Sequence, residues 1–245
     1  MTTPRLYVSD AGAGRVVALP ADEAHHVKNV LRLGTGAAVR IFDGRGAEWD
    51  GRVDNVSRAG VAVAVGAPVA ATREPPVRVT LAIGLLKGEQ MDDVVRDATM
   101  LGAAAIAPVT SAYVAASWSS ARLESARERW RRVAIASARQ CGRAVVPDIA
   151  PVRSFDAVLD AHRDDRVVIC LEPGANASGK DDDDASARPE SALLCVGPEG
   201  GWSAPEIARA RSSGARLLQL GPRTLRAETA PVVALTSLWN DWGWS

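Results

Sequence analysis

The fold class follows from residues 193–211, which read LLCVGPEGGWSAPEIARAR. An apolar run of strand length ends at Val196, and a loop with three glycines in five residues follows it. Ser203 then stands where a helix N-cap is expected, directly before a helix pattern. Residues 216–239 repeat this order of apolar run, glycine-containing polar loop and helix pattern. Such repeated units predict an α/β domain whose mostly parallel sheet is covered by helices on both faces.

The same alternation extends back along the chain to Val77. Strands are expected at 77–85, 104–109, 167–171, 193–196 and 216–220, and helices at 89–101, 120–140, 204–211 and 229–239. Residues 1–72 have a different character, with short strands broken by glycine turns such as Asp43-Gly44, a hairpin signal. One short helix is expected at 22–32, with Asp22 near its cap. We therefore predict a small β-barrel domain at 1–72 and an α/β domain at 77–245, joined through Pro75 and Pro76.

Composition excludes several classes of protein. The chain has 245 residues, of which 47% are apolar, and 29 basic residues balance 29 acidic ones. These are values of a folded protein and exclude a disordered one, and zero net charge means that nucleic-acid binding must rest on a local patch. The N-terminus lacks the pattern of a secretory signal and no long apolar run is present, so we expect a cytoplasmic protein without a membrane span. Cys141, Cys170 and Cys195 are far apart and are expected to be reduced thiols, and no metal site is expected.

Two common nucleotide-binding motifs are not supported. Residues 174–180 match most of the P-loop pattern, but Asp181 replaces its Ser/Thr and more aspartates follow. No glycine motif opens a helix in the way that a Rossmann dinucleotide site requires. The segment 174–190 is instead expected to be a solvated acidic loop.

The two glycine-containing loops point to a ligand site. Residues 197–201 and 220–230 each follow a strand and precede a helix. Because the carboxyl ends of parallel strands meet at one edge of a sheet, the two loops should form a pocket there. Glycines let a ligand approach the backbone closely, so the pocket suits a small molecule with several hydrogen-bonding groups.

A local basic segment is the second functional signal. Residues 119–143 contain seven arginines against two glutamates. Arginine suits phosphate because its planar fork donates paired hydrogen bonds, although a basic helix is also compatible with a simple solvated face. In the first domain, His25 and His26 with Lys28 and Arg32 either contact RNA or cap a helix.

These motifs together resemble the RsmE family of SPOUT methyltransferases, which methylate N3 of a uridine in 16S ribosomal RNA. The resemblance covers nearly all of residues 5–240 except the acidic loop. It is carried by Gly197–Gly201 (GPEGG), Leu220–Ala230 (LGPRTLRAETA), His26-Val27, Val30–Arg32, Phe42–Gly44, Lys87–Met91 (KGEQM), Leu101-Gly102, Pro108, Gln140–Arg143 (QCGR) and Val146-Pro147. The chain departs from the family pattern at Asp97 and Met100, where the family carries a lysine and a glutamate, and at Ala227, where it carries a threonine.

The resemblance implies a PUA-like RNA-binding barrel at 1–72 and a SPOUT methyltransferase domain with a trefoil knot at 77–245. It also implies S-adenosylmethionine as cofactor, a homodimer, and 16S ribosomal RNA or the small ribosomal subunit as substrate. The cofactor-binding residues would be Leu171, Glu172, Pro173, Val196, Gly197, Pro198, Glu199, Gly200, Gly201, Leu220, Gly221, Leu225 and Arg226. The RNA-binding residues would be His25, Lys28, Arg32, Arg129, Arg132, Arg139 and Arg143.

A catalytic hypothesis follows from the resemblance and from the chemistry of the reaction. Arg226 and Arg143 would stabilise negative charge that develops on the uridine oxygens. Glu228 would accept the N3 proton or orient Arg226, unless it only caps the last helix. Two alternatives stay open: a SPOUT enzyme with another RNA target, and a non-catalytic RNA-binding or ribosome-assembly protein.

Overall fold

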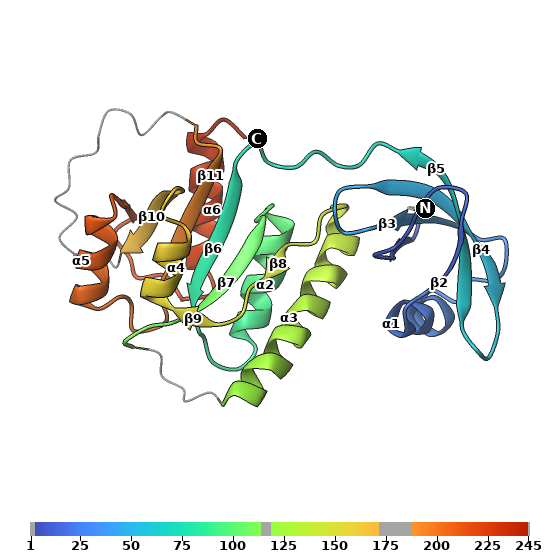
Figure 1. Cartoon of the computed structure of the whole chain (residues 1–245), viewed down its shortest axis with the longest axis horizontal. Coiled ribbons are helices and arrows are strands. Elements are labelled where there is room, and N and C mark those ends of the chain that lie inside the picture. Colours follow the sequence, from blue (N-terminus) through green and yellow to red (C-terminus); the bar gives the residue numbers. More distant parts are fainter. Residues whose placement is uncertain (1–2, 114–118, 172–187, 245) are drawn as a thin grey trace. The chain divides into compact units, whose positions relative to one another are not determined.

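The computed structural model describes residues 3–113, 119–171 and 188–244. The chain divides into two compact units (Figure 1). Unit 1 comprises Met1–Glu74 and Ile135–Val146, and unit 2 comprises Pro75–Ala134 and Pro147–Ser245. The boundary between the first two segments lies in the expected linker, whereas the membership of Ile135–Val146 in unit 1 was not expected from the sequence.

Unit 1 is built on a five-stranded sheet with the order β1-β3-β4-β5-β2. Its elements are β1 (Arg5–Tyr7), β2 (Val16–Ala18), α1 (Ala21–His25), the π-helical turn η1 (His26–Val30), β3 (Ala38–Phe42), β4 (Glu48–Val56) and β5 (Val61–Val69). The hairpin expected around Asp43-Gly44 is confirmed, since β3 pairs with β4 in antiparallel register. The expected helix at 22–32 is shorter: α1 begins after Pro20, and Asp22 lies in its first turn without capping it. Inward-facing valine, leucine and isoleucine side chains fill the core of this unit.

Unit 2 is an α/β unit whose seven-stranded sheet is parallel in every recorded pairing. The strand order is β12-β10-β11-β6-β7-β8, and β9 pairs with β7. Its strands are β6 (Arg78–Gly84), β7 (Ala105–Thr110), β8 (Asp148–Ile149), β9 (Arg153–Ser154), β10 (Arg166–Leu171), β11 (Ser191–Val196) and β12 (Arg216–Gln219). Its helices are α2 (Gln90–Met100), α4 (Phe155–Ala161), α5 (Ala204–Ser212) and α6 (Ala230–Asp241), together with the first part of α3 (Ser120–Cys141).

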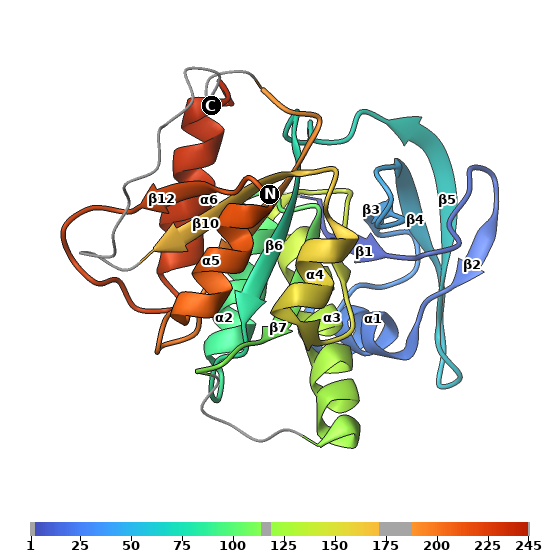
Figure 2. The same cartoon turned by 60° about the vertical axis from the view of Figure 1, so that its left-hand side comes forward.

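Helices cover both faces of this sheet, as predicted. Figure 2 shows α4 and α5 on one face and α2 and α6 on the other. Beyond their polar first residues the central strands are mostly apolar because both of their faces are buried, and β11 is almost entirely inaccessible to solvent. The parallel arrangement brings the carboxyl ends of β6, β10, β11 and β12 to one edge of the sheet.

Candidate functional site

A cavity of about 420 Å³ lies at this edge of the sheet in unit 2. The loop after β11, the loop after β12 and the first residue of α2 all contribute to its wall. Its lining residues are Gln90, Cys170, Val196, Gly197, Pro198, Glu199, Gly201, Trp202, Ile207, Leu220, Gly221, Arg223, Leu225, Arg226, Ala227, Glu228 and Ala230. The size is within the usual range for small-molecule sites, and the cavity lies where parallel α/β sheets bind ligands.

The loop at 197–201 folds tightly on itself, and glycine makes this possible. Gly201 has a φ of +70°, a value that side chains other than glycine rarely adopt. A Cβ atom at Gly197 would lie 3.1 Å from the backbone of Gly201. A Cβ atom at Gly84, the last residue of β6, would lie 2.4 Å from Cδ of Pro198. The backbone of the loop therefore packs directly against β6 at the edge of the cavity.

The exit of this loop is fixed by a capping box, as the sequence indicated for Ser203. The Ser203 hydroxyl accepts a hydrogen bond from the backbone N–H of Glu206, while Oε2 of Glu206 accepts one from the Ser203 backbone N–H at 2.8 Å. The other carboxylate oxygen of Glu206 accepts a hydrogen bond from the backbone N–H of Ala112 at 2.9 Å. Glu206 thus joins the glycine loop to the segment after β7, which favours a preformed cavity wall.

The polar side of the cavity is formed by Gln90, Arg226 and Glu228. The side-chain amide of Gln90 donates a hydrogen bond from Nε2 to Oε2 of Glu228 at 3.1 Å. Nη1 of Arg226 lies 4.0 Å from Oε1 of the same carboxylate. The Glu228 side chain is 20% exposed, whereas the Arg226 side chain is 86% exposed. Glu228 accepts a hydrogen bond from Gln90 and lies within ion-pair distance of Arg226, and the N-cap position of α6 is Thr229, not Glu228.

The remaining wall is apolar. Trp202 packs its ring against Phe155 with a centroid separation of 4.4 Å, and Ile207 packs against the same cluster. Burial raises the pKa of Cys170 to about 12, so this thiol stays neutral and is not an activated nucleophile. An apolar wall, backbone polar groups and a charged pair at one side suit a ligand with a flat apolar portion and a polar reacting end.

The structure brings most of the predicted cofactor-binding residues into this one cavity. Gly200 does not line it and instead lies next to Tyr113, while Leu171 ends β10 beside Gln219 of β12. Glu172, Pro173 and the acidic run Asp181–Asp184 lie outside the described residues. The residues of the lining set that match the prediction are Val196, Gly197, Pro198, Glu199, Gly201, Leu220, Gly221, Leu225 and Arg226.

Gln90 is the principal site residue that the sequence analysis missed. It belongs to the KGEQM motif of residues 87–91, which was noted for its resemblance but given no role. β6 lies next to β11 in the sheet, so the connection from β6 to α2 ends at the same cavity as the two glycine loops. The sequence did contain a signal for Gln90. The strand expected at 77–85 and the helix expected at 89–101 form a third strand–loop–helix unit, and Gln90 is a polar residue at the start of that helix.

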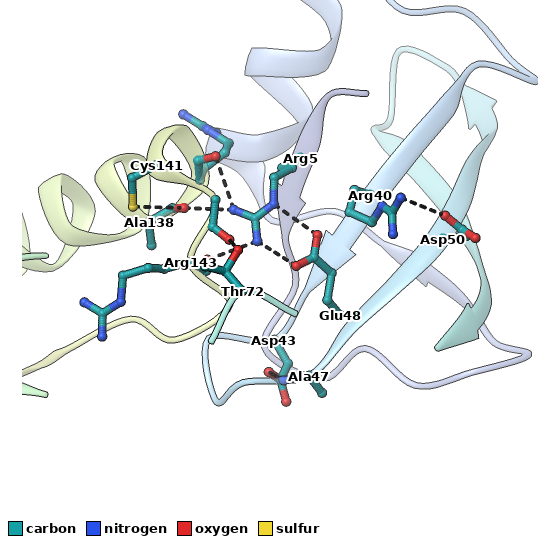
Figure 3. Close-up of polar contacts among 12 residues, drawn as sticks. Arg5, Arg40, Asp43, Ala47, Glu48, Asp50, Thr72, Ala138, Cys141 and Arg143 are labelled. Carbon is teal, nitrogen blue, oxygen red and sulfur yellow. Dashed lines mark hydrogen bonds and ion pairs between the residues drawn. The ribbon is translucent and has the colours of Figure 1, made fainter. Parts of the chain in front are cut away.

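Arg143 is placed in unit 1, and it is not among the lining residues of the cavity. The residue is 5% exposed, and its guanidinium donates to the carboxylate of Glu74, with Nε 3.1 Å from both oxygens. Its backbone carbonyl accepts a hydrogen bond from Arg5, which also bonds the carbonyl of Ala138 and forms an ion pair with Glu48 (Figure 3). Arg143 therefore helps to hold the chain of unit 1 together, and we do not include it in the catalytic hypothesis.

The predicted RNA-binding side chains differ in their availability. His25 and Arg32 are exposed and Lys28 is partly exposed on unit 1, and the His25 ring is hydrogen-bonded to Asn29. On α3, Arg132 is exposed. Other arginines of the basic segment are ion-paired within the chain: Arg127 with Glu124, Arg129 with Asp92, Arg131 with Glu128, Arg139 with Glu23 and Arg143 with Glu74. The local excess of positive charge is thus smaller than the sequence count indicates.

Within residues 3–113, 119–171 and 188–244, no group of three or more His, Cys, Asp or Glu side chains is arranged to hold a metal ion. None of the described helices is both long enough and apolar enough to cross a membrane.

Known protein families match both parts of the chain. A family described as an RNA methyltransferase domain matches residues 73–239, and a family described as an RNA methyltransferase PUA domain matches residues 19–63. The chain is 32% identical to ribosomal RNA small subunit methyltransferase E of Bacillus subtilis, over 90% of this chain and 88% of that protein. It is 33% identical to the protein of the same name from Mycobacterium tuberculosis, over 93% of this chain and 89% of that protein.

Solved structures agree with these sequence relatives. A ribosomal RNA small subunit methyltransferase E from Neisseria gonorrhoeae bound to S-adenosyl methionine has a TM-score of 0.87 and 28% identity, covering 98% of both chains. A putative methyltransferase from Legionella pneumophila in complex with the bound cofactor SAM has a TM-score of 0.86 and 27% identity, again covering 98% of both chains. The extent and identity of these matches exceed what a shared fold alone requires. The chain therefore belongs to the RNA methyltransferase family that includes the ribosomal RNA small subunit methyltransferase E proteins, with a PUA domain followed by an α/β methyltransferase domain.

Proposed function

We propose that this chain transfers a methyl group from S-adenosylmethionine to N3 of a uridine in 16S ribosomal RNA of the small subunit. The observation that carries the proposal is the cavity of unit 2, where two glycine-containing loops meet the Arg226–Glu228 pair. The names of the relatives support a ribosomal RNA substrate, and the two cofactor-bound structures support the cofactor.

The residues of the cavity fit this cofactor. A Cβ atom at Gly197 would lie only 3.1 Å from the backbone of Gly201, and Gly201 and Gly221 have φ values of +70° and +105°. Backbone N–H and C=O groups of such loops suit the adenine and ribose edges, while Val196, Leu220 and Leu225 provide apolar contact. When bound, S-adenosylmethionine supplies an electrophilic methyl group on a sulfonium centre.

The reaction at the uridine requires a proton acceptor and a charge-stabilising group. Methylation would form a bond from N3 to the methyl carbon and break the bond between that carbon and the sulfonium sulfur, which would keep the electron pair as a thioether. The N3 proton released in this step is assigned to the Glu228 carboxylate. The exposed Arg226 side chain is free to reach the uridine oxygens and stabilise the negative charge that develops on them. N3 lies on the pairing edge of the base, so the target nucleotide has to be unpaired or flipped out.

RNA contact outside the cavity is assigned to exposed cationic side chains. We place phosphate contacts at Lys28 and Arg32 of the PUA domain, with His25 beside them, and at Arg132 of α3. Arg129 and Arg139 would first have to leave Asp92 and Glu23, so we give them smaller contributions. Phosphate contacts position the substrate, whereas the cavity selects the base.

Three features implied by the family resemblance complete the proposal. The chain forms a homodimer, and we assign the exposed Val233 on α6 to its interface. The chain around the cavity is knotted, which is compatible with a sheet in which β11 lies between β6 and β10. The enzyme acts in the cytoplasm, where its ribosomal substrate is assembled. Light scattering of the purified protein tests the dimer.

A methyl-transfer assay tests the activity. Purified protein is incubated with labelled S-adenosylmethionine and small ribosomal subunits that lack the modification, and nucleosides are resolved by mass spectrometry. We expect N3-methyluridine from the wild-type protein, and a rate lowered by about 100-fold for Arg226→Ala and Glu228→Gln. Asp164→Asn, which removes an exposed carboxylate remote from the cavity, is the matched control and should retain the wild-type rate.

The same assay separates the alternatives. A different methylated nucleoside would assign the enzyme to another RNA target. No transfer to any RNA, together with no cofactor binding by calorimetry, would favour a non-catalytic RNA-binding protein and contradict the proposal.

A further inference from the structure

Gln90 makes a directional contact with the carboxylate that the proposed reaction uses. Its Nε2 donates to Oε2 of Glu228 at 3.1 Å, and both side chains line the cavity. The two residues are 138 positions apart in the sequence, so only the fold brings them together. The KGEQM motif that contains Gln90 has no other role in the reaction described above.

The contact distinguishes the two oxygens of the Glu228 carboxylate. Oε2 is occupied by the Gln90 amide, whereas Oε1 is turned toward Arg226 at 4.0 Å. A glutamate at the end of a loop has several rotamers, and a single donor on a fixed backbone selects among them. When Arg226 extends toward a substrate, Oε1 loses this neighbour and is free to accept a proton.

Gln90 can act in this way because it is held on a rigid element. It is the first residue of α2, and the buried side chains of Met91, Val94 and Val95 anchor that helix in the core of unit 2. The turn before it passes through Gly88, whose φ is +58°. A functional group supported by a packed helix is placed more accurately than one carried by a loop.

We propose that Gln90 is the positioning residue for Glu228: its amide sets the orientation in which the carboxylate accepts the proton, without itself touching the reacting atoms. This inference rests on the proposed function, because it assigns Gln90 to the same reaction. A positioning role requires a hydrogen-bond donor at this place, and side-chain volume alone is not sufficient.

The test compares three substitutions that differ in their ability to donate. Gln90→Leu and Gln90→Met preserve most of the volume but cannot donate to the carboxylate, whereas Gln90→Lys keeps a donor. We expect kcat for methyl transfer to fall about tenfold or more in the first two and to stay within about threefold of wild type in Gln90→Lys. The dissociation constant for S-adenosylmethionine should stay within about twofold in all three. Met100→Ala, at an exposed position of the same helix, is the control and should have the wild-type kcat.

A double substitution shows whether Gln90 acts through Glu228. In a Glu228→Gln background, Gln90→Leu should cause no further loss of kcat, because the group that it positions is already neutralised. An equal loss in both backgrounds would overturn the inference, and so would a wild-type kcat in Gln90→Leu.

A measurement independent of activity separates this inference from the proposed function. The ¹³C resonance of the Glu228 side-chain carboxyl should move in Gln90→Leu and stay in place in Met100→Ala. If the wild-type protein transfers no methyl group, the proposed function fails, and a resonance that does not move would overturn the positioning role as well. If transfer occurs and the resonance moves without any change in kcat, the positioning role alone is wrong.

Discussion

The indole N–H of Trp239 on α6 donates a hydrogen bond of 2.7 Å to the carbonyl oxygen of Leu101, the C-cap residue of α2. The Gln90–Glu228 bond joins the opposite end of α2 to the loop that leads into α6, and each pair spans 138 residues of sequence. The two helices therefore run in the same direction and are tied together at both ends. The position of the Glu228 loop depends on this pairing of helices.

Loss of the Trp239 hydrogen bond should lower stability. Trp239→Phe leaves the Leu101 carbonyl without its indole donor in a largely buried place, and we expect a loss of about 1–3 kcal/mol in the free energy of unfolding. Urea unfolding measures the effect. Trp242→Phe, at the C-cap of the same helix, is the matched control, because the buried Trp242 Nε1 has no hydrogen-bond partner among the described residues. Equal destabilisation by both substitutions would show that ring packing, and not the hydrogen bond, is responsible.

The close approach of Gly84 to Pro198 predicts a strong effect of one added methyl group. In Gly84→Ala the new Cβ atom would lie 2.5 Å from the backbone nitrogen of Pro198, so the glycine loop would have to move. We expect about 1–3 kcal/mol of destabilisation and at least a tenfold weaker affinity for S-adenosylmethionine. Calorimetric titration and thermal melting provide the measurements. Gly60→Ala, where the Cβ atom meets nothing within 4 Å, should change neither quantity.

The buried Glu23 of unit 1 predicts a pH dependence of stability. Burial raises the pKa of Glu23 above the ordinary glutamate value, although the guanidinium of Arg139 opposes the shift. The folded chain therefore holds this proton more tightly than the unfolded chain does. The resulting stabilisation is fully present below the ordinary glutamate pKa and is lost as the pH rises through the raised value.

Glu23→Gln tests this expectation, because glutamine cannot titrate. Relative to this variant, the wild-type protein should become less stable as the pH rises through the window between the ordinary and the raised pKa. Melting temperatures measured across that window give the difference, with the exposed Asp10→Asn as control. A constant offset between wild type and Glu23→Gln at every pH would contradict the assignment.

The three cysteines should differ in reactivity. Burial raises the pKa of Cys170 to about 12 and also raises that of Cys195, so both thiols remain protonated and inaccessible. Cys141 is partly exposed. We expect iodoacetamide at pH 8 to alkylate Cys141 in the native protein and all three cysteines after denaturation, as read by peptide mass spectrometry. Rapid native labelling of Cys170 would contradict the burial of this thiol.

The long elements of unit 2 were predictable because their patterns are strong. The strand expected at 77–85 is β6, and the helices expected at 89–101 and 120–140 are α2 and α3, each within two residues at either end. The two-residue strands β8 and β9 were missed because so few residues carry no periodicity. α4 was missed although Ser154 caps it and Phe155, Val158 and Leu159 have helical spacing, since seven residues are too short to dominate the pattern.

The site was predictable where local backbone chemistry defines it and not where distant residues meet. The glycines of residues 197–201 indicate a ligand-binding loop, because few other structural roles require three glycines within five residues. No local pattern pairs Gln90 with Glu228 or assigns Arg143 to Glu74, because those contacts join residues that are far apart in the sequence. The arginine count of the basic segment was misleading for the same reason: the carboxylates that neutralise Arg129, Arg139 and Arg143 come from other parts of the chain.

The discontinuity of unit 1 has a consequence for biosynthesis. Arg5 emerges among the first residues of the chain, yet the carbonyls of Ala138 and Arg143 that its guanidinium bonds are made more than 130 residues later. At the usual rate of about 5–20 residues per second, the first unit waits several seconds for its last segment. During that interval the nascent PUA domain lacks part of its own structure, so it cannot complete folding until the first segment of the methyltransferase domain, Pro75–Ala134, has also been made.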